Sequence, residues 1–489
     1  MKKLIALLLA AVMAFGLFGC SGSDTESTDA DDNQQTTAPA QETEPPQETE
    51  PAAPGGLQVG YGKVDITPMG KTVHLQGGDW KSRISTGMLD MQYVTCIAIR
   101  EGDQTILLYT MDFKVATDNF VDPAKAFVSA ATGVPEENIL MNATHTHAAT
   151  AIRYNWDGVE AYRTTFNEAS VKAAEKAIKD LSSAKILAGS TQTQDLTHVR
   201  HYVDANGNVV LRGSGQEVAH YREPDQELQL VKFQRDEEKK KDILLLSFPV
   251  HATFNEGGTE LSADFPSPMR DFIEQNSDCL VAYFMGAAGD QTPGSTIPSV
   301  KKIKEYRKYG ETLGQYALDA LPTLTEVAGE DIELSAKKFT APTNKKNVDK
   351  LVQANTVVQL AEQYGRNSSQ VKNALAEYGF AQYLEASWTI TRSRLDDTMS
   401  MELKVFRVGD LSFVLAPYEM FGHHGTDIKT QSPFDNTFII TCAEGSWNYI
   451  ASEEAFDFNA YESYCCYFER GTAEKLVDEY LNMLTELKK

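Results

Sequence analysis

Residues 138–147 read NILMNATHTH, an apolar run that leads into two histidines one residue apart. The run is typical of a buried β-strand, and side chains two residues apart on a strand face the same side. His145 and His147 are therefore predicted to lie together at the end of a strand, where α/β proteins place their sites. Such a pair can hold one divalent ion, or supply one ligand and one acid–base group. The alternative is two polar residues that cap a strand.

Similar apolar runs, mixed with helical patterns, continue along the chain. Hairpin-length turns separate several of the runs, for example at residues 101–104 and at Gly409-Asp410, which favours mixed sheets over a doubly wound parallel sheet. Helical periodicity occurs over 122–132, 158–181, 300–324, 369–388 and 472–489. We predict one large α/β domain over 57–489, with its site at strand ends.

Further polar residues follow other apolar runs. His251 ends the run of residues 242–250, and Asp264 is a candidate to orient a histidine from behind. Glu419 follows the apolar run 411–417, where a carboxylate is costly unless it is paired or binds a metal. Two separate strands that both end in a histidine favour a shared ion. Taken singly, each has a simpler explanation as a residue of the rim, a turn or a cap.

The glycine-rich segment 286–293, GAAGDQTP, follows another apolar run. Its glycines are interpreted as places where the backbone approaches a ligand closely, with Thr292 on the same rim. The alternative is a tight strand-to-loop turn. His423 and His424 are predicted to lie on a helix face and are not assigned to the site.

The N-terminus has the pattern of an export signal. Lys2 and Lys3 precede an apolar run that ends in LFGC, a lipobox with Cys20. Residues 1–20 are predicted to be a lipoprotein signal peptide, so that lipid on Cys20 anchors the protein to the outer face of a bacterial membrane. Residues 21–56 are rich in Ser, Thr, Glu and Pro and are predicted to be a disordered acidic stalk.

The charge and the cysteines exclude some classes of function. The net charge is -24, of which the stalk contributes -9, so most of the acidity belongs to the folded part. This argues against nucleic acid as a partner, because phosphate binding requires a basic face. Beyond Cys20 the five cysteines, none of them in a C-x-x-C pair, indicate neither a disulfide framework nor a cysteine zinc site.

Several blocks, in this order, resemble the neutral/alkaline (non-lysosomal) ceramidase family. The resemblance covers Leu57 to about Tyr461 and is stronger for the blocks together than for any one. The blocks are GYGKVDITPMG (60–70), THTH (144–147), RHYVDANGNV (200–209), REPDQELQLVKF (222–233), FPVHATF (248–254) with SADFP (262–266), GAAGDQTP (286–293), APYEMF (416–421) and NYIASEEAFDFNAYE (448–462). Thr292 stands where the family usually has serine.

The resemblance implies a role for each matching residue. Zn²⁺ would be held by His145, His251, Glu419 and Tyr449. His147 would transfer protons, while Tyr461 and Arg200 would contact the substrate, and Thr292 would lie beside them. Without the resemblance, Tyr449 and Tyr461 would pass as ordinary core aromatics.

The implied activity is zinc-dependent hydrolysis of an N-acyl amide, either ceramide or a related N-acyl lipid or amine. One alternative is a zinc-dependent esterase or deacetylase on the same scaffold, and a substrate panel separates the two. A second alternative is a non-enzymatic ligand-binding surface lipoprotein, which would need no ion.

Overall fold

The computed structural model describes residues 56–76, 83–154, 156 and 158–489. The predicted signal peptide lies outside the described residues, as does the predicted stalk apart from Gly56. Ala53–Lys489 form one compact unit. Within the described residues, none of the helices combines the length and the apolar character needed to cross a membrane.

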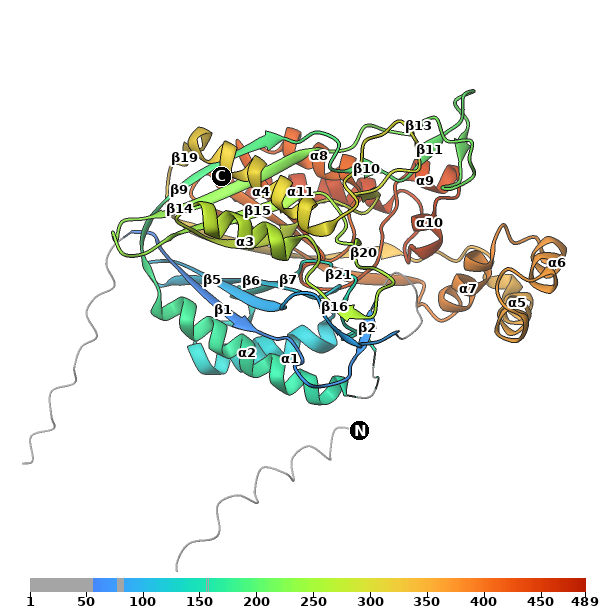
Figure 1. Cartoon of the computed structure of the whole chain (residues 1–489), viewed down its shortest axis with the longest axis horizontal. Helices are drawn as coiled ribbons and strands as arrows, with labels where there is room; N and C mark the ends of the chain where they lie inside the picture. The colour runs from blue at the N-terminus through green and yellow to red at the C-terminus, as the bar shows by residue number, and fades with distance from the viewer. Residues whose placement is uncertain (1–55, 77–82, 155, 157) are drawn as a thin grey trace, which may run out of the picture. The chain divides into compact units, whose positions relative to one another are not determined.

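Two mixed sheets form the centre of this unit (Figure 1). The larger has the order β17-β15-β14-β9-β1-β5-β6-β7, with β19 paired to β9, and the smaller has the order β20-β21-β22-β23. Only the β6–β7, β15–β17 and β22–β23 pairs are parallel in these two sheets. The prediction of a mixed α/β fold is therefore confirmed. The strands are β1 (Gln58–Asp65), β5 (Tyr93–Glu101), β6 (Gln104–Met111), β7 (Ile139–Ala143), β9 (Ser182–Gln192), β14 (Glu227–Arg235), β15 (Asp242–Phe248), β17 (Cys279–Met285), β19 (Thr325–Glu326), β20 (Ile332–Pro342), β21 (Thr398–Val408), β22 (Leu411–Ala416) and β23 (Asn436–Thr441).

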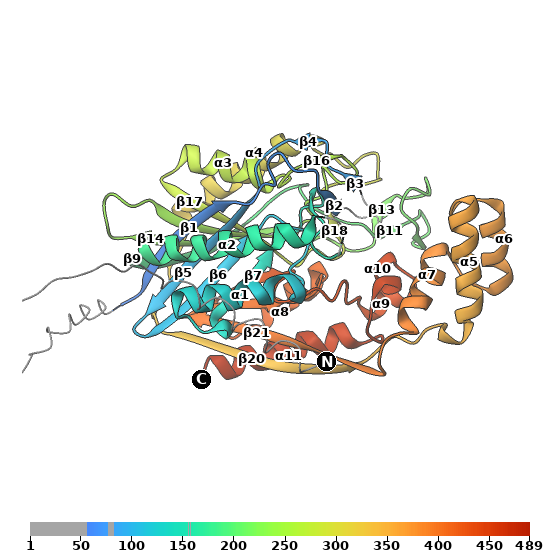
Figure 2. The ribbon, with the colours of Figure 1, turned by 90° about the horizontal axis from the view of Figure 1, so that it is seen from below.

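The sheets pack face to face, with helices on both outer faces (Figures 1 and 2). Alternation along the strands explains the layers, since Ile97 and Leu108 face the smaller sheet while Cys96 and Tyr109 face the helices. One pair of helices covers each half of the larger sheet, and a third pair covers the smaller sheet. The two pairs on the larger sheet are α1 (Asp118–Thr132) with α2 (Val159–Lys179) and α3 (Pro266–Asn276) with α4 (Tyr306–Ala320). The pair on the smaller sheet is α8 (Gly422–Gln431) with α11 (Thr472–Leu487).

A helical insertion joins β20 to β21. It consists of α5 (Leu351–Tyr364), α6 (Ser369–Tyr378) and α7 (Tyr383–Arg392), and it has a small core of its own. The single helix predicted over 369–388 is therefore wrong. Gly379 adopts a left-handed φ of 70° and ends α6, and a new helix begins at Tyr383.

Shorter elements surround the strand ends. Two small sheets matter for the site: β10 pairs with β18, and β11 pairs with both β12 and β13. The short elements are β2 (His74–Gln76), β3 (Arg83–Ile84), β4 (Gly87–Met88), β8 (Ala149–Thr150), β10 (His198–Val199), β11 (Tyr202–Val203), β12 (Val209–Val210), β13 (Ala219–His220), β16 (Glu260–Leu261), β18 (Gln291–Thr292), α9 (Glu453–Asp457) and α10 (Tyr461–Cys465).

The ends of the central strands meet in one place. The N–H of Ala143, at the end of β7, donates to the carbonyl of Cys442, just after β23. The N–H of Gly286, just after β17, donates to the carbonyl of Phe248 at the end of β15. The segments that carry the predicted site residues therefore start from adjoining strand ends.

Candidate metal centre

Three buried histidines converge beyond these strand ends. Ligand nitrogens of His145, His147 and His251 all lie within 4.8 Å of one another. The Nε2 atoms of His145 and His147 are 3.2 Å apart. Strand alternation does not explain this pair, because β7 ends at Ala143 and His145 has a left-handed φ of 63°. The predicted proximity is confirmed, but a turn produces it.

A carboxylate and a phenol complete the cluster. Glu419 Oε2 lies 3.1 Å from His251 Nε2 and 3.4 Å from His145 Nε2. The Tyr449 hydroxyl lies 3.4 Å from His251 Nε2. An isolated parallel bridge between Glu419 and Tyr449 brings these two residues together, although each belongs to a different loop.

Each histidine is held by a partner at Nδ1. His145 Nδ1 lies 2.6 Å from the carbonyl of Lys114, and His251 Nδ1 lies 2.9 Å from the carbonyl of Gln291. Because a carbonyl only accepts, both rings donate from Nδ1, and Nε2 is the nitrogen that faces the cluster. His147 differs, since its Nδ1 lies 2.9 Å from a carboxylate oxygen of Glu256.

The electrostatics of the cluster follow from burial and from the mutual contacts. Burial lowers the pKa of His251 to about 4 and also lowers that of His147. Burial opposes charge on Glu419, but His145 and His251 outweigh it and hold its pKa well below the usual range. Burial likewise opposes charge on His145, but Cys442 and Glu419 outweigh it and raise its pKa to about 10. The cluster thus favours a positive charge beside Glu419.

A pocket of about 630 Å³ opens onto this cluster. Four residues implied to be catalytic line it, namely His147, Arg200, Thr292 and Tyr461. Thr292 lies on β18, opposite His198 of β10. The structure therefore brings all eight residues that the resemblance implies to one pocket or to the buried cluster at its base.

Arg200 has a central place in this pocket. Its guanidinium carbon lies 5.3 Å from the ring centre of Tyr449 and 5.6 Å from that of Tyr461. Its Nε donates to Glu462 over 2.6 Å, and an Nη donates to the carbonyl of Gly289. Burial opposes the guanidinium charge, but Glu462 outweighs it and raises the pKa of Arg200. The charge is therefore held in place beside both tyrosines.

Two sequence-based interpretations are wrong. Asp264 does not contact a histidine, since its carboxylate accepts from the backbone N–H groups of Asn255 and Phe265. The glycines of 286–293 do not give room to a ligand. A Cβ on Gly289 would lie 2.5 Å from the carbonyl oxygen of Glu419, so this glycine allows two protein segments to pack closely.

Sequence reasoning missed three polar residues. Lys114 and Glu256 line the pocket, and Glu462 holds Arg200. Glu462 directly follows Tyr461 in one of the blocks that resemble the family, so its position was a usable signal. Lys114 and Glu256 lie in loops without a recognisable pattern.

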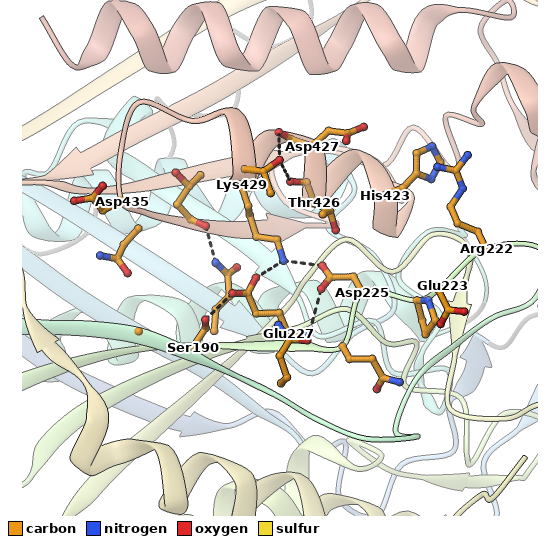
Figure 3. A pocket seen from close by; sticks show the side chains of 18 residues that line it. Ser190, Arg222, Glu223, Asp225, Glu227, His423, Thr426, Asp427, Lys429 and Asp435 are labelled. Atoms are coloured by element: carbon orange, nitrogen blue, oxygen red, sulfur yellow. Dashed lines mark hydrogen bonds and ion pairs between the residues drawn. The ribbon is translucent and has the colours of Figure 1, made fainter.

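A second pocket, of about 640 Å³, is strongly polar (Figure 3). At its centre, Lys429 Nζ lies 2.7 Å from Asp225 and 2.6 Å from Glu227. His423 also lines this pocket, while His424 lies near Glu474 outside it. The ammonium group is the shared ion-pair partner of the two central carboxylates, and this pairing accounts for their closeness.

The fold and the cluster define an α/β protein with a buried set of histidine, carboxylate and phenol donors that opens into a pocket. Residues 57–294 match the sequence model of the neutral/alkaline non-lysosomal ceramidases, N-terminal part. None of the curated proteins matches the chain in sequence.

Two solved structures share the fold. One is a ceramidase complexed with C2, with 16% identity and a TM-score of 0.63, covering 88% of this chain and 75% of that chain. The other is the neutral ceramidase from Pseudomonas aeruginosa, with 17% identity and a TM-score of 0.64, covering 88% of this chain and 74% of that chain. The predicted resemblance to the ceramidases is confirmed.

Proposed function

We propose that this chain is a zinc-dependent hydrolase of N-acyl amides, in which His145, His251, Glu419 and Tyr449 hold the ion. The convergence of four donors from separate segments on one buried point carries this proposal. Imidazole nitrogen and carboxylate oxygen are ligands that suit zinc, and the acidic pKa of Glu419 keeps it ionised. When bound, zinc lowers the pKa of water to about 7 and polarises a carbonyl group.

The chain's own residues would perform the remaining steps. Arg200 and Tyr461 lie where they can donate hydrogen bonds to the acyl oxygen as negative charge develops on it. His147 presents Nε2 to the cluster, so it can take a proton from water and return it to the leaving amine nitrogen as the C–N bond breaks.

The pocket also suggests the substrate class. Its wall includes Val209, Val210, Leu211 and Phe458, of which Leu211 is 74% exposed. An apolar wall beside a polar centre suits a molecule with an acyl chain and an amide. We propose an N-acyl lipid as the substrate, with ceramide as one member of this class. Lipid attachment at Cys20 on the outer face of a bacterial membrane would keep the enzyme near such substrates.

Metal removal combined with a substrate panel tests the function. Purified protein is expected to contain one zinc per chain and to hydrolyse N-acyl amides, with kcat/KM rising with acyl length. Dialysis against a chelator should abolish the activity, and added zinc should restore it. Faster cleavage of matched esters would favour the esterase alternative. Full hydrolysis after complete metal removal would contradict the proposal.

Tyr461→Phe is expected to keep the metal and lower kcat by about a hundredfold, which is typical for the loss of one donor to a developing oxyanion. The ring contact with Tyr449 would remain, since only the hydroxyl is lost. Tyr364→Phe is a matched control, because Tyr364 on α5 is 48% exposed compared with 46% for Tyr461. Steady-state kinetics and elemental analysis provide the measurement, and unchanged turnover would exclude a catalytic role for the Tyr461 hydroxyl.

A further inference from the structure

We propose that Glu256 is a positioning residue that orients His147 and fixes the location of its ring proton. This inference rests on the proposed function, in which His147 transfers protons. His147 is 4% exposed, whereas the Glu256 side chain is 40% exposed at the pocket wall. Their 2.9 Å contact therefore joins a buried ring to a carboxylate at the edge of the solvent.

The contact determines which nitrogen carries the proton. An ionised carboxylate only accepts hydrogen bonds, so the neutral ring of His147 donates from Nδ1 to Glu256. Its Nε2 then keeps a lone pair on the side of the cluster, 3.2 Å from His145 Nε2. A lone pair on Nε2 is what a proton acceptor at this point requires.

The three histidines are thereby separated into two kinds. His145 and His251 donate to backbone carbonyls, which are neutral and fixed by the fold. Only His147 among the three has a carboxylate at Nδ1, whereas His145 Nδ1 also lies 3.4 Å from the sulfur of Cys442. A carboxylate behind an imidazole fixes the tautomer and the orientation of the ring.

The loop that carries Glu256 is anchored from inside the protein. The backbone N–H of Asn255 donates to Asp264 over 2.8 Å, and the Asn255 amide donates to Ser262 Oγ over 3.0 Å. Asp264 is fully buried. The effect of Asp264 on a histidine is therefore indirect, because it holds the loop from which Glu256 reaches His147.

The solvent exposure of Glu256 indicates that its effect should appear in the reaction rate and not in the stability of the fold. Ion pairs at the surface add little to stability, since water and salt screen them. Removing Glu256 should therefore leave the folded state nearly unchanged and alter the rate of the reaction. A positioning role thus predicts a change in kcat without a matching change in KM, melting temperature or metal content.

The kinetic test uses the full chain and compares two substitutions of Glu256 with one control. Glu256→Ala should lower kcat by about tenfold to a hundredfold, the range typical for such supporting carboxylates, with KM within about twofold. Glu256→Asp should recover part of the loss, and added formate should partly restore Glu256→Ala. Glu260→Ala is the control, because Glu260 is an exposed carboxylate of the same segment outside the pocket wall and should behave as wild type.

A second readout does not depend on activity. In ¹⁵N-histidine-labelled protein, His147→Gln identifies the His147 signals among those of the nine histidines. The wild type should show the Nδ1-protonated form of His147, and Glu256→Ala should shift it toward the other tautomer. This spectrum tests Glu256 even if the protein hydrolyses no amide, so the failure of the two proposals can be told apart.

Three results would overturn the inference. An unchanged tautomer in Glu256→Ala would show that Glu256 does not set the proton position. Unchanged kcat would show that its contact with His147 has no role in turnover. Loss of zinc from Glu256→Ala would make His147 a metal ligand, supported by Glu256, and not a proton-transfer group.

Discussion

Replacing His251 by alanine is expected to remove both the bound ion and the hydrolytic activity while leaving the fold largely intact. His251 Nε2 lies within 3.4 Å of both Glu419 and Tyr449, so it links two of the other proposed ligands. The imidazole that is removed is neutral, so the substitution itself leaves no buried charge at this position. Because a bound metal supplies several kcal/mol to the transition state, we expect activity to fall at least about a thousandfold, at 1.36 kcal/mol for each tenfold.

The measurement is elemental analysis, circular dichroism and amide hydrolysis on the same preparation. His145→Ala should behave in the same way, because His145 Nε2 lies 3.4 Å from the same carboxylate. His74→Ala is the matched control, since His74 is half-buried and does not line the pocket. If either site variant retained stoichiometric zinc, the ligand assignment would be wrong.

Breaking the buried pair of Asp112 and Arg270 is expected to have the largest effect on stability. Both Nη atoms of Arg270 donate to the Asp112 carboxylate, over 3.0 and 2.8 Å, and neither side chain reaches solvent appreciably. Removing one partner leaves a buried charge without compensation. Arg270→Met should therefore lower the free energy of unfolding by about 3–5 kcal/mol. Denaturant titration followed by circular dichroism measures this change.

A double substitution separates the loss of the pair from the burial of an unpaired charge. Arg270→Met combined with Asp112→Leu should recover much of the loss, because an apolar pair avoids the uncompensated carboxylate. Lys172→Ala is the control, since Lys172 and Glu168 form an exposed pair on α2 that should contribute under about 1 kcal/mol. A destabilisation by Arg270→Met no larger than that of the control would contradict the argument.

The same pair supports the candidate metal centre. Thr144, directly before His145, donates from Oγ1 to Asp112 over 3.2 Å. The Asp112 carboxylate also accepts from the backbone N–H of Tyr93 over 2.9 Å. The turn that gives His145 its left-handed φ is therefore tied to the larger sheet through this carboxylate. We expect Arg270→Met to weaken ion binding as well as folding.

Strand ends were predictable from local patterns. Runs of apolar residues correctly located β7, β15 and β22, and the polar residues beyond them did converge. The conformation of the turns was not predictable, because a single sequence does not reveal that His145 leaves the strand geometry. In the same way, the break at Gly379 within a continuous helical pattern was missed, since glycine is also tolerated inside helices.

Long-range pairing was also beyond local patterns. Tyr449 and Arg200 were assigned to the site from the family resemblance alone. Their neighbouring residues do not distinguish them from a core aromatic and a surface arginine. The Glu256–His147 contact joins positions 109 apart, and Glu256 lies in a glycine-rich turn that suggests only a loop. Such contacts depend on the register of the whole sheet, which no short stretch encodes.

The donors of the cluster come from segments between residues 145 and 449, and this wide spacing sets an order of events. An unfolded chain cannot gather four groups that lie so far apart along its length, because closing such loops costs conformational entropy. We therefore expect capture of the proposed ion to follow completion of both sheets. Because the ion would bind the folded state and not the unfolded chain, it would stabilise the folded state by mass action. Folding and ion binding would therefore be thermodynamically linked.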